Sequence, residues 1–195
     1  DEAQDFKENW WLALSELLRD AQSGVMYTFF DDNQNLYGGV NQVAALIDSP
    51  PFPLYENCRN TQQIHQLVAR FHPQGPFIKA LGPLGSAPEQ VDYVTADEML
   101  RKLRKLLHQL INEEAVDPQD LVILTPRAVE RSALTEGLAL GNFVLTRKQP
   151  HAPDQIQVTT IHRFTGLERR VVIIAELDET AHPDKNLILY IGCSR

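Results

Sequence analysis

Leu121-Val122-Ile123-Leu124 is a continuous apolar run that ends at Thr125-Pro126. A short run of this kind, without polar alternation, is typical of a strand that is buried on both faces of a sheet. Comparable runs, each expected to form a strand, occur at residues 25–30, 77–81, 157–161, 171–175 and 187–191. They alternate with helical patterns, so the sequence predicts an α/β fold in which a parallel sheet is covered by helices on both faces.

The clearest predicted helix begins after Thr95. Thr95 and Glu98 have the spacing of a capping box, and apolar residues recur at helical spacing over residues 99–111. The same reasoning predicts helices at residues 6–21, from Asn60 or Thr61 to Phe71, and from Pro126 through Leu138. Prolines at positions 50, 51 and 53 interrupt regular structure and form the best candidate for a linker.

The composition limits both the class of protein and its compartment. Of the 195 residues, 43% are hydrophobic and 23% are charged, which excludes wholesale disorder. The net charge is −8, so contact with nucleic acid must come from a local patch. The two cysteines, Cys58 and Cys193, fit a reducing compartment. No apolar run approaches the roughly 20 residues of a membrane span and no signal peptide opens the sequence, so we expect a cytoplasmic protein without membrane contact.

Asp1-Glu2 is the first candidate for chemistry. At the carboxyl end of a parallel strand, an Asp can hold Mg²⁺ and a neighbouring Glu can deprotonate an attacking water. A solvated acidic pair is the alternative, and the two residues alone do not decide between them.

Four further residues carry groups suited to phosphate or to a nucleic-acid base. The Gln34 amide could sense a phosphate oxygen, and the Tyr37 ring could stack on a base. Arg59 and Arg195 carry planar, permanently charged guanidinium groups that match phosphate. Without such a ligand, Gln34 would belong to a polar turn, Tyr37 would be a core tyrosine, and Arg59 and Arg195 would be surface arginines. The histidines show no zinc-ligand spacing with the cysteines, and no phosphate-cradling loop of the type GxxxxGK followed by Ser or Thr occurs.

Five short blocks occur in an order that is more specific than any one of them. They are DEAQD (residues 1–5), DDNQNLYG (31–38), ENCRNT (56–61), TIHRFTGLE (160–168) and LYIGCSR (189–195). In this order the chain resembles the superfamily 1 helicases of the UvrD/Rep/PcrA type, from their Walker B motif DExQD to their sixth motif. The resemblance covers nearly the whole chain, although residues 72–155 match only in outline.

The resemblance implies two RecA-like domains of the P-loop NTPase helicase type, each a parallel sheet flanked by helices, with ATP between them and single-stranded DNA across their top. Residues 1–48 would be the C-terminal remnant of an incomplete first RecA-like domain, and residues 51–195 the second. The Walker A motif would lie upstream in a longer parent protein, so this fragment alone is expected to be inactive. Family members often act in DNA repair or beside a fused or associated nuclease domain.

The resemblance also implies a role for each matching position. Asp1 would hold Mg²⁺, Glu2 would act as the base toward water, and Gln34 would sense the γ-phosphate. Arg59 and Arg195 would stabilise charge on that phosphate. Gly166 and Glu168 would bind the nucleotide. Tyr37, Thr160 and His162 would contact the nucleic acid.

Three departures from the family pattern leave alternatives open. Cys58 stands where a Tyr usually stacks on adenine, Thr165 replaces a Lys of the fifth motif, and Phe30 replaces a Gly before the third. A non-catalytic nucleic-acid-binding or assembly module that retains the helicase fold would tolerate such changes. A motor that works on RNA is a third possibility.

Overall fold

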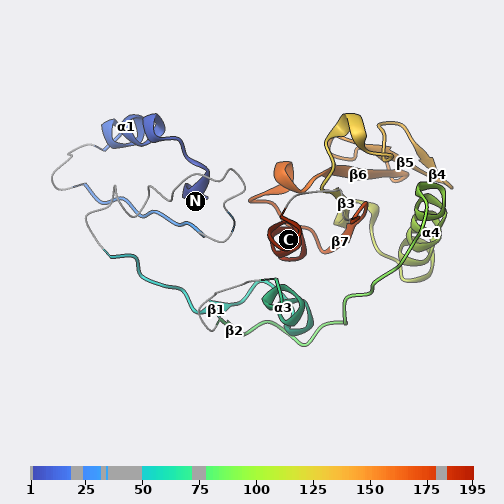
Figure 1. Ribbon diagram of the computed structural model, residues 1–195, viewed down its shortest axis with the longest axis horizontal. Helices are drawn as coiled ribbons and strands as arrows, with labels where there is room; N and C mark the ends of the chain where they lie inside the picture. The colour runs from blue at the N-terminus through green and yellow to red at the C-terminus, as the bar shows by residue number, and fades with distance from the viewer. Residues whose placement is uncertain (1, 19–23, 32–33, 35–49, 72–77, 179–183) are drawn as a thin grey trace.

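The computed structural model describes residues 2–18, 24–31, 34, 50–71, 78–178 and 184–195. Its helices are α1 (Glu8–Glu16), α3 (Gln62–Ala69), α4 (Ala96–His108) and α5 (Lys185–Cys193). Its strands are β1 (Glu56–Asn57), β2 (Lys79–Ala80), β3 (Leu121–Thr125), β4 (Ala139–Leu140), β5 (Phe143–Thr146), β6 (Gln155–Thr160) and β7 (Val171–Ile174). Figure 1 shows α1 and the amino terminus on one side of the molecule, and the larger sheet with α4 on the other.

The larger sheet confirms the predicted α/β class but is mixed rather than purely parallel. Its strand order is β4-β5-β6-β3-β7. The pairs β5–β6, β6–β3 and β3–β7 are parallel, whereas β4 pairs with β5 in the antiparallel direction. The strands predicted at 121–124, 157–161 and 171–175 correspond to β3, β6 and β7 within about two residues at each end.

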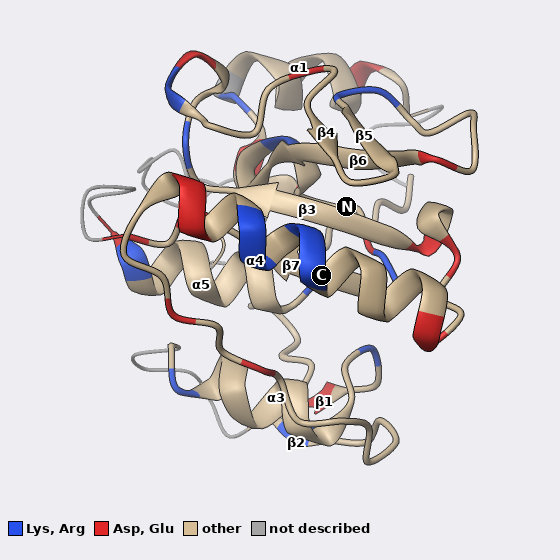
Figure 2. Ribbon diagram, turned by 90° about the vertical axis from the view of Figure 1, so that its right-hand side faces the viewer, with Lys and Arg blue, Asp and Glu red and all other residues tan. Residues whose placement is uncertain are grey.

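Helices cover both faces of this sheet, and β3 is therefore buried on both of its sides. Leu121 and Ile123 face a core that contains Met99, Leu103 and Leu107 of α4. Val122 and Leu124 face a second core, to which α3 contributes Val68 and α5 contributes Ile188 and Ile191. Figure 2 shows α4 and α5 beside the sheet, with α3 further away next to β1 and β2. The continuous apolar run therefore marked a two-sided central strand, as predicted.

Two of the four predicted helices begin where they were expected, after Thr95 and after Thr61. Thr95 precedes α4, and its Oγ1 accepts the Glu98 backbone N–H at 3.2 Å. Glu98 Oε2 accepts the N–H of Val94 at 2.9 Å, one residue before the position that a capping box requires. Thr61 precedes α3, and its Oγ1 accepts the Ile64 N–H at 3.4 Å.

The helix predicted from Pro126 through Leu138 is wrong. This segment contains only a 3-10 turn at Val129–Arg131 before β4 begins. Side chains take over the backbone donors that a helix would use: Thr125 Oγ1 accepts the Arg127 N–H at 3.1 Å, and Glu176 Oε1 accepts the Ala133 N–H at 2.7 Å. The β4–β5 hairpin that follows was not predicted, because β4 is only two residues long.

The strand predicted at 187–191 is also wrong, because these residues belong to α5. Asp184 Oδ1 accepts the Leu187 N–H at 2.9 Å and so caps the helix. Ile188, Tyr190 and Ile191 are all buried, so the run lacks the polar face by which a helix is recognised. A short run of this kind is ambiguous between a strand and a buried helix.

The N-terminal residues form less regular structure than expected. Of the helix predicted at 6–21, the described residues 6–18 contain α1 (Glu8–Glu16), and residues 19–21 lie outside the described residues; residues 25–30 are not a strand. One backbone bond anchors this run within the described residues, from the Ala3 N–H to the Phe29 carbonyl at 3.0 Å. A small apolar cluster of Ala3, Trp11, Phe6, Leu14 and Phe30 holds the two segments together.

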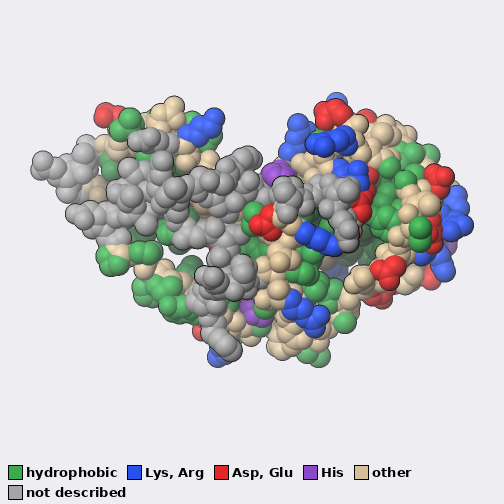
Figure 3. All heavy atoms as spheres, in the orientation of Figure 1, with side chains coloured by type: hydrophobic (Ala, Val, Ile, Leu, Met, Phe, Trp, Pro, Cys, Tyr) green, Lys and Arg blue, Asp and Glu red, His purple; other side chains and the backbone are tan. Residues whose placement is uncertain are grey.

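The proline-rich residues 50–55 are extended and exposed, as a linker would be. Phe52, Leu54 and Tyr55 are 88%, 68% and 49% exposed, and Figure 3 shows hydrophobic side chains along this stretch at the lower left. The strand predicted near 77–81 is β2, which pairs in parallel with β1. The proposed domain limits, 1–48 and 51–195, remain a prediction. Over the described ranges, no helix is both long and apolar enough to cross a membrane.

Residues 82–85 lie directly against the start of α3. The Gln62 N–H donates to the Pro83 carbonyl at 2.8 Å, which satisfies a donor that the helix leaves free. A Cβ at Gly82 would lie 2.0 Å from the Asn60 carbonyl oxygen, so only glycine fits here. This contact fixes the loop that carries Arg59 and Asn60.

Candidate functional site

The candidate site is built around Arg195, which lies two residues beyond the end of α5. Its side chain is 1% exposed. Arg195 Nη2 donates a hydrogen bond to Gln34 Oε1, and its Nη1 lies 3.9 Å from Glu2 Oε1. These two contacts bring the N-terminal turn to the end of α5, so residues that are distant in sequence meet. The structure thus brings three of the predicted site residues into one polar cluster.

Two neighbouring side chains hold Glu2 and Gln34 in place. Gln4 Nε2 donates to Glu2 Oε2 at 2.6 Å, and Gln4 Oε1 accepts the Asp31 N–H at 3.1 Å. Gln34 Nε2 donates to Asp31 Oδ2 at 2.8 Å. Each amide therefore uses both its donor and its acceptor, which fixes its orientation.

Tyr190 connects α5 to the same network. Its hydroxyl donates to Asp31 Oδ2 at 3.0 Å. Burial raises the pKa of the Tyr190 hydroxyl, and Asp31 raises it further, so the group stays protonated and remains a donor at neutral pH.

Burial and the charges of Glu2 and Arg59 determine the pKa of the Arg195 guanidinium. Burial lowers the pKa of its guanidinium, the Glu2 carboxylate raises it, and Arg59 lowers it. Arginine remains protonated throughout the physiological range. Arg195 Nε is buried and has no hydrogen-bond partner among the described residues. A buried cation of this kind, with a donor to spare, is suited to a phosphate oxygen.

Arg59 lies in a loop that is tied to the end of α5. Asn57 Oδ1 accepts the N–H groups of Arg59 and Asn60, each at 3.1 Å. Asn60 Nδ2 donates to the Ser194 carbonyl at 3.3 Å. The Arg59 side chain is half-exposed and forms an ion pair with Glu168, with 3.1 Å between Nε and Oε2. Arg59 and Arg195 thus lie near each other, while Arg59 is held by a different carboxylate.

The end of β6 and the loop after it carry the other predicted residues. Thr160 Oγ1 accepts the Arg163 N–H at 3.2 Å and caps the turn Ile161–Phe164, in which His162 is half-buried. Gly166 has φ +76°, and a Cβ at that position would lie 3.6 Å from Glu2 Cγ. A Cβ at that distance would make only ordinary van der Waals contact, so it is the positive φ, and not a lack of space, that favours glycine where this loop meets Glu2.

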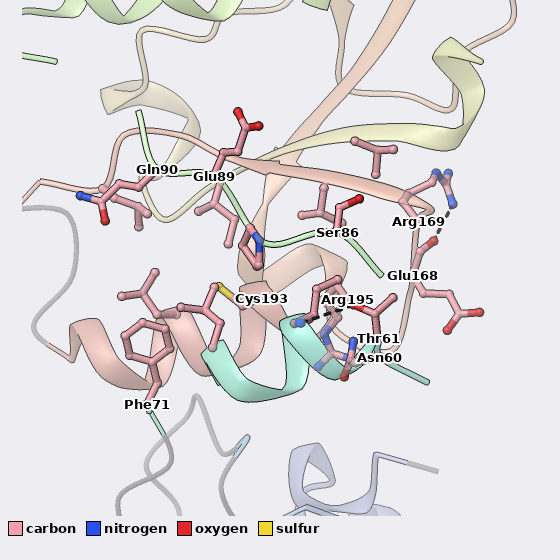
Figure 4. A pocket seen from close by; sticks show the side chains of 18 of the residues that line it. Asn60, Thr61, Phe71, Ser86, Glu89, Gln90, Glu168, Arg169, Cys193 and Arg195 are labelled. Carbon is pink, nitrogen blue, oxygen red and sulfur yellow. Dashed lines mark hydrogen bonds between the residues drawn. The ribbon is translucent and has the colours of Figure 1, made fainter. Parts of the chain in front are cut away.

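A cleft of about 1660 Å³ opens beside this cluster, under residues 86–93. Its lining includes Cys58, Arg59, Glu168 and Arg195, but not Glu2. Figure 4 shows Arg195 close to Asn60 and Thr61 at one end of the cleft, with Glu168 at its rim. A ligand in the cleft would therefore reach both arginines.

Two predicted residues fall outside this account. Asp1 and Tyr37 lie outside the described residues, so the metal-binding and base-stacking predictions for them stay predictions. Among the residues that the structure does describe, no group of three or more His, Cys, Asp or Glu side chains could hold a metal ion.

Sequence reasoning missed four contributors to the site. They are Gln4, Asp31, Asn60 and Tyr190, all of which bond to the predicted residues or their neighbours. Each lies inside one of the five quoted blocks, so position in a block was a usable signal. Which partner each side chain would find was not readable from residue type.

Comparison with known proteins adds no identification. No protein-family model matches the chain, and no curated protein matches it in sequence.

Proposed function

We propose that this chain is part of an ATP-dependent single-stranded DNA translocase or helicase, and that it supplies the acidic base and the arginines of the nucleotide site. The observation that carries the proposal is the contact of Arg195 with Gln34 and Glu2. The helicase resemblance places all three residues at the terminal phosphate, and they come from opposite ends of the sequence. An accidental match of short motifs would not be expected to bring them together.

The fold is compatible with this proposal. An α/β sheet with three parallel strand pairs and helices on both faces is what a second RecA-like domain would have. Folds of this class serve many functions, so the argument rests on the site and not on the sheet.

The residues present fit a nucleoside triphosphate. The buried Nε of Arg195 has no partner in the described part of the chain, and Arg59 is half-exposed beside it. ATP would supply the phosphoanhydride bond whose hydrolysis drives the motor. Arg59 and Arg195 would stabilise the charge on its terminal phosphate, and Glu2 would orient and deprotonate water. Mg²⁺ would be held by Asp1, a role that rests on the resemblance alone.

The proposed DNA contacts lie at the end of β6 and in the loop after it. Thr160 is the last residue of β6 and His162 lies in the turn after it, at the carboxyl end of a strand, the edge where open parallel sheets bind ligands. Tyr37 would stack on a base. Contacts to phosphate and base stacking require no particular sequence, as movement along a strand demands.

The proposal places this chain in a longer protein that contains a phosphate-binding loop, and ATP hydrolysis by that protein tests it. We expect single-stranded DNA to stimulate ATP turnover, and Glu2→Gln to reduce it about 10²–10⁴-fold, the usual contribution of a general base. The matched control is Glu16→Gln, an exposed acid on α1, which should retain turnover. The present chain, which lacks the loop, should not turn over ATP.

The non-catalytic module remains a second candidate because of Thr165. Its hydroxyl donates to the His162 carbonyl at 2.9 Å and brings no charge to a position where the helicase pattern has a lysine. Tight binding of single-stranded DNA without any ATP turnover by the longer protein would favour this candidate and reject the motor.

A further inference from the structure

We propose that Asp31 and Tyr190 are a positioning pair that couples the phosphate-sensing Gln34 to the arginine at the end of α5. The inference rests on the proposed function and adds two residues to it. Neither residue would touch the nucleotide, so both would act through the groups that they hold.

The pair closes a ring of hydrogen bonds. Asp31 Oδ2 accepts from Gln34 Nε2 at 2.8 Å and from the Tyr190 hydroxyl at 3.0 Å. The other end of the Gln34 amide, Oε1, accepts from Arg195 Nη2. Tyr190 lies in α5, and Arg195 follows the same helix. The ring therefore connects two points on one helical segment through two side chains of the N-terminal segment.

Asp31 determines which way the Gln34 amide points. A carboxylate accepts hydrogen bonds only, so it binds the NH₂ end of the amide and leaves the oxygen for Arg195. The reversed amide would place its NH₂ group against a guanidinium, where two donors meet and no bond forms. Gln34 can bond to Arg195 in this arrangement because Asp31 holds its other end.

Tyr190 in turn anchors Asp31. Its side chain is 8% exposed, and its ring packs in the core shared by α3, α5 and the sheet. A hydroxyl fixed in this way restricts the carboxylate more than water would. Movement of Gln34 on phosphate binding would consequently be transmitted to α5, and movement of α5 would change how Gln34 and Arg195 are oriented.

Tyr190→Phe in the longer, loop-containing protein is the test, because it removes one hydroxyl and retains the ring. The lost hydrogen bond is one to a charged group, which is stronger than a neutral one, so we expect kcat to fall by about 10-fold or more while the KM for ATP changes less than about twofold. Tyr27→Phe is the matched control, because that side chain is 81% exposed, and it should leave kcat unchanged.

Two substitutions of Asp31 separate positioning from a structural role. The amide oxygen of Asp31→Asn has two lone pairs and can accept from both Gln34 and Tyr190, but its NH₂ group also permits the reversed arrangement, so this variant should recover only part of the kcat that Asp31→Ala loses. A role in folding alone would lower the unfolding temperature of Tyr190→Phe without the selective loss of kcat.

The outcomes distinguish the two proposals. No ATP turnover by the unsubstituted protein would overturn the proposed function and, with it, this inference. Normal ATP turnover by the unsubstituted protein, together with the same kcat in Tyr190→Phe and Tyr27→Phe, would overturn the coupling but not the proposed function. Equal loss in Asp31→Asn and Asp31→Ala would overturn positioning by hydrogen bonds, because an acceptor oxygen at this position would then recover nothing.

Discussion

Glu176 offers a quantitative test of the packing at the carboxyl end of β3. Its side chain is 4% exposed. One carboxylate oxygen accepts the Ala133 N–H at 2.7 Å, and the other accepts the hydroxyls of Ser132, at 2.8 Å, and Thr125. These three donors all lie at or after the end of β3, so one side chain organises the loop that replaced the predicted helix.

The cost of removing Glu176 follows from the groups that it leaves behind. Glu176→Ala leaves one N–H and two hydroxyls without their acceptor, at about 1–3 kcal/mol for each group that stays unsatisfied. The lost carboxylate no longer has to be buried, and the hydroxyls can rotate, which offsets part of this cost. We expect a net loss of about 3 kcal/mol in the free energy of unfolding. Glu176→Gln retains an acceptor for Ala133, so about 1 kcal/mol is expected.

Urea unfolding of the chain, followed by circular dichroism, measures both changes. With a slope of about 2 kcal/mol/M, the midpoint should fall by about 1.5 M for Glu176→Ala and by about 0.5 M for Glu176→Gln. Glu130→Ala, an exposed acid in the same loop, is the control and should shift the midpoint little. Equal shifts for the Ala and Gln variants would refute the reasoning, because they would mean that the acceptor oxygens do not carry the stability.

Burial is the main cause that raises the pKa of Asp5, and the Glu2 carboxylate raises it further. The charged form of Asp5 is therefore disfavoured in the folded protein, so the free energy of unfolding should decrease as pH rises above about 4. Asp5→Asn should therefore stabilise the chain at pH 7 and lose that advantage below pH 3.8, the ordinary pKa of an aspartate. Urea unfolding at pH 7 and at a pH below 3.8 measures the difference. Burial raises the pKa of Cys193 to about 11, so at pH 8 the exposed Cys58 should react with iodoacetamide before Cys193 does. Mass spectrometry after brief treatment measures the order of alkylation, and faster labelling of Cys193 would contradict its burial. A Cβ at Gly82 would lie 2.0 Å from a backbone oxygen, so Gly82→Ala should lower the unfolding temperature well beyond Gly137→Ala, which has space but a φ of +77°.

The central strands and the capped helices were predictable because local signals and burial agree there. The run at β3 is apolar at every position and buried on both faces. Thr61 and Thr95 have side chains suited to capping, and apolar residues follow both at helical spacing. In each case, no information from a distant part of the chain was needed.

The errors arose where distant residues override local preference. The segment after Pro126 depends on Glu176, which no local pattern could reveal. The buried run in α5 lacks a polar face, and its cap at Asp184 was the only local indication of a helix. Residues 25–30 have the composition of a strand, yet Val25 and Tyr27 are 73% and 81% exposed. Strand propensity is not enough where the described chain offers no neighbouring strand.

The residue order pointed to three residues that the structure brings together, but not to the network around them, and their roles stay a prediction. Glu2, Gln34 and Arg195 were candidates through the order of the motifs, and the structure places them together. The supporting roles of Gln4, Asp31 and Tyr190 depend on side-chain orientation, which follows from packing rather than from spacing.

The bond between Gln34 and Arg195 joins residues that are 161 positions apart, which has a consequence for how the protein is made. Contacts between such distant residues form late, since the long intervening loop must be closed first. During synthesis the N-terminal acids and amides emerge long before their arginine, so the nascent chain passes through a stage in which the sheet can fold but the site cannot. The competence of the site would then be acquired in one late step, when α5 docks, and truncated products of translation would carry a folded sheet without it.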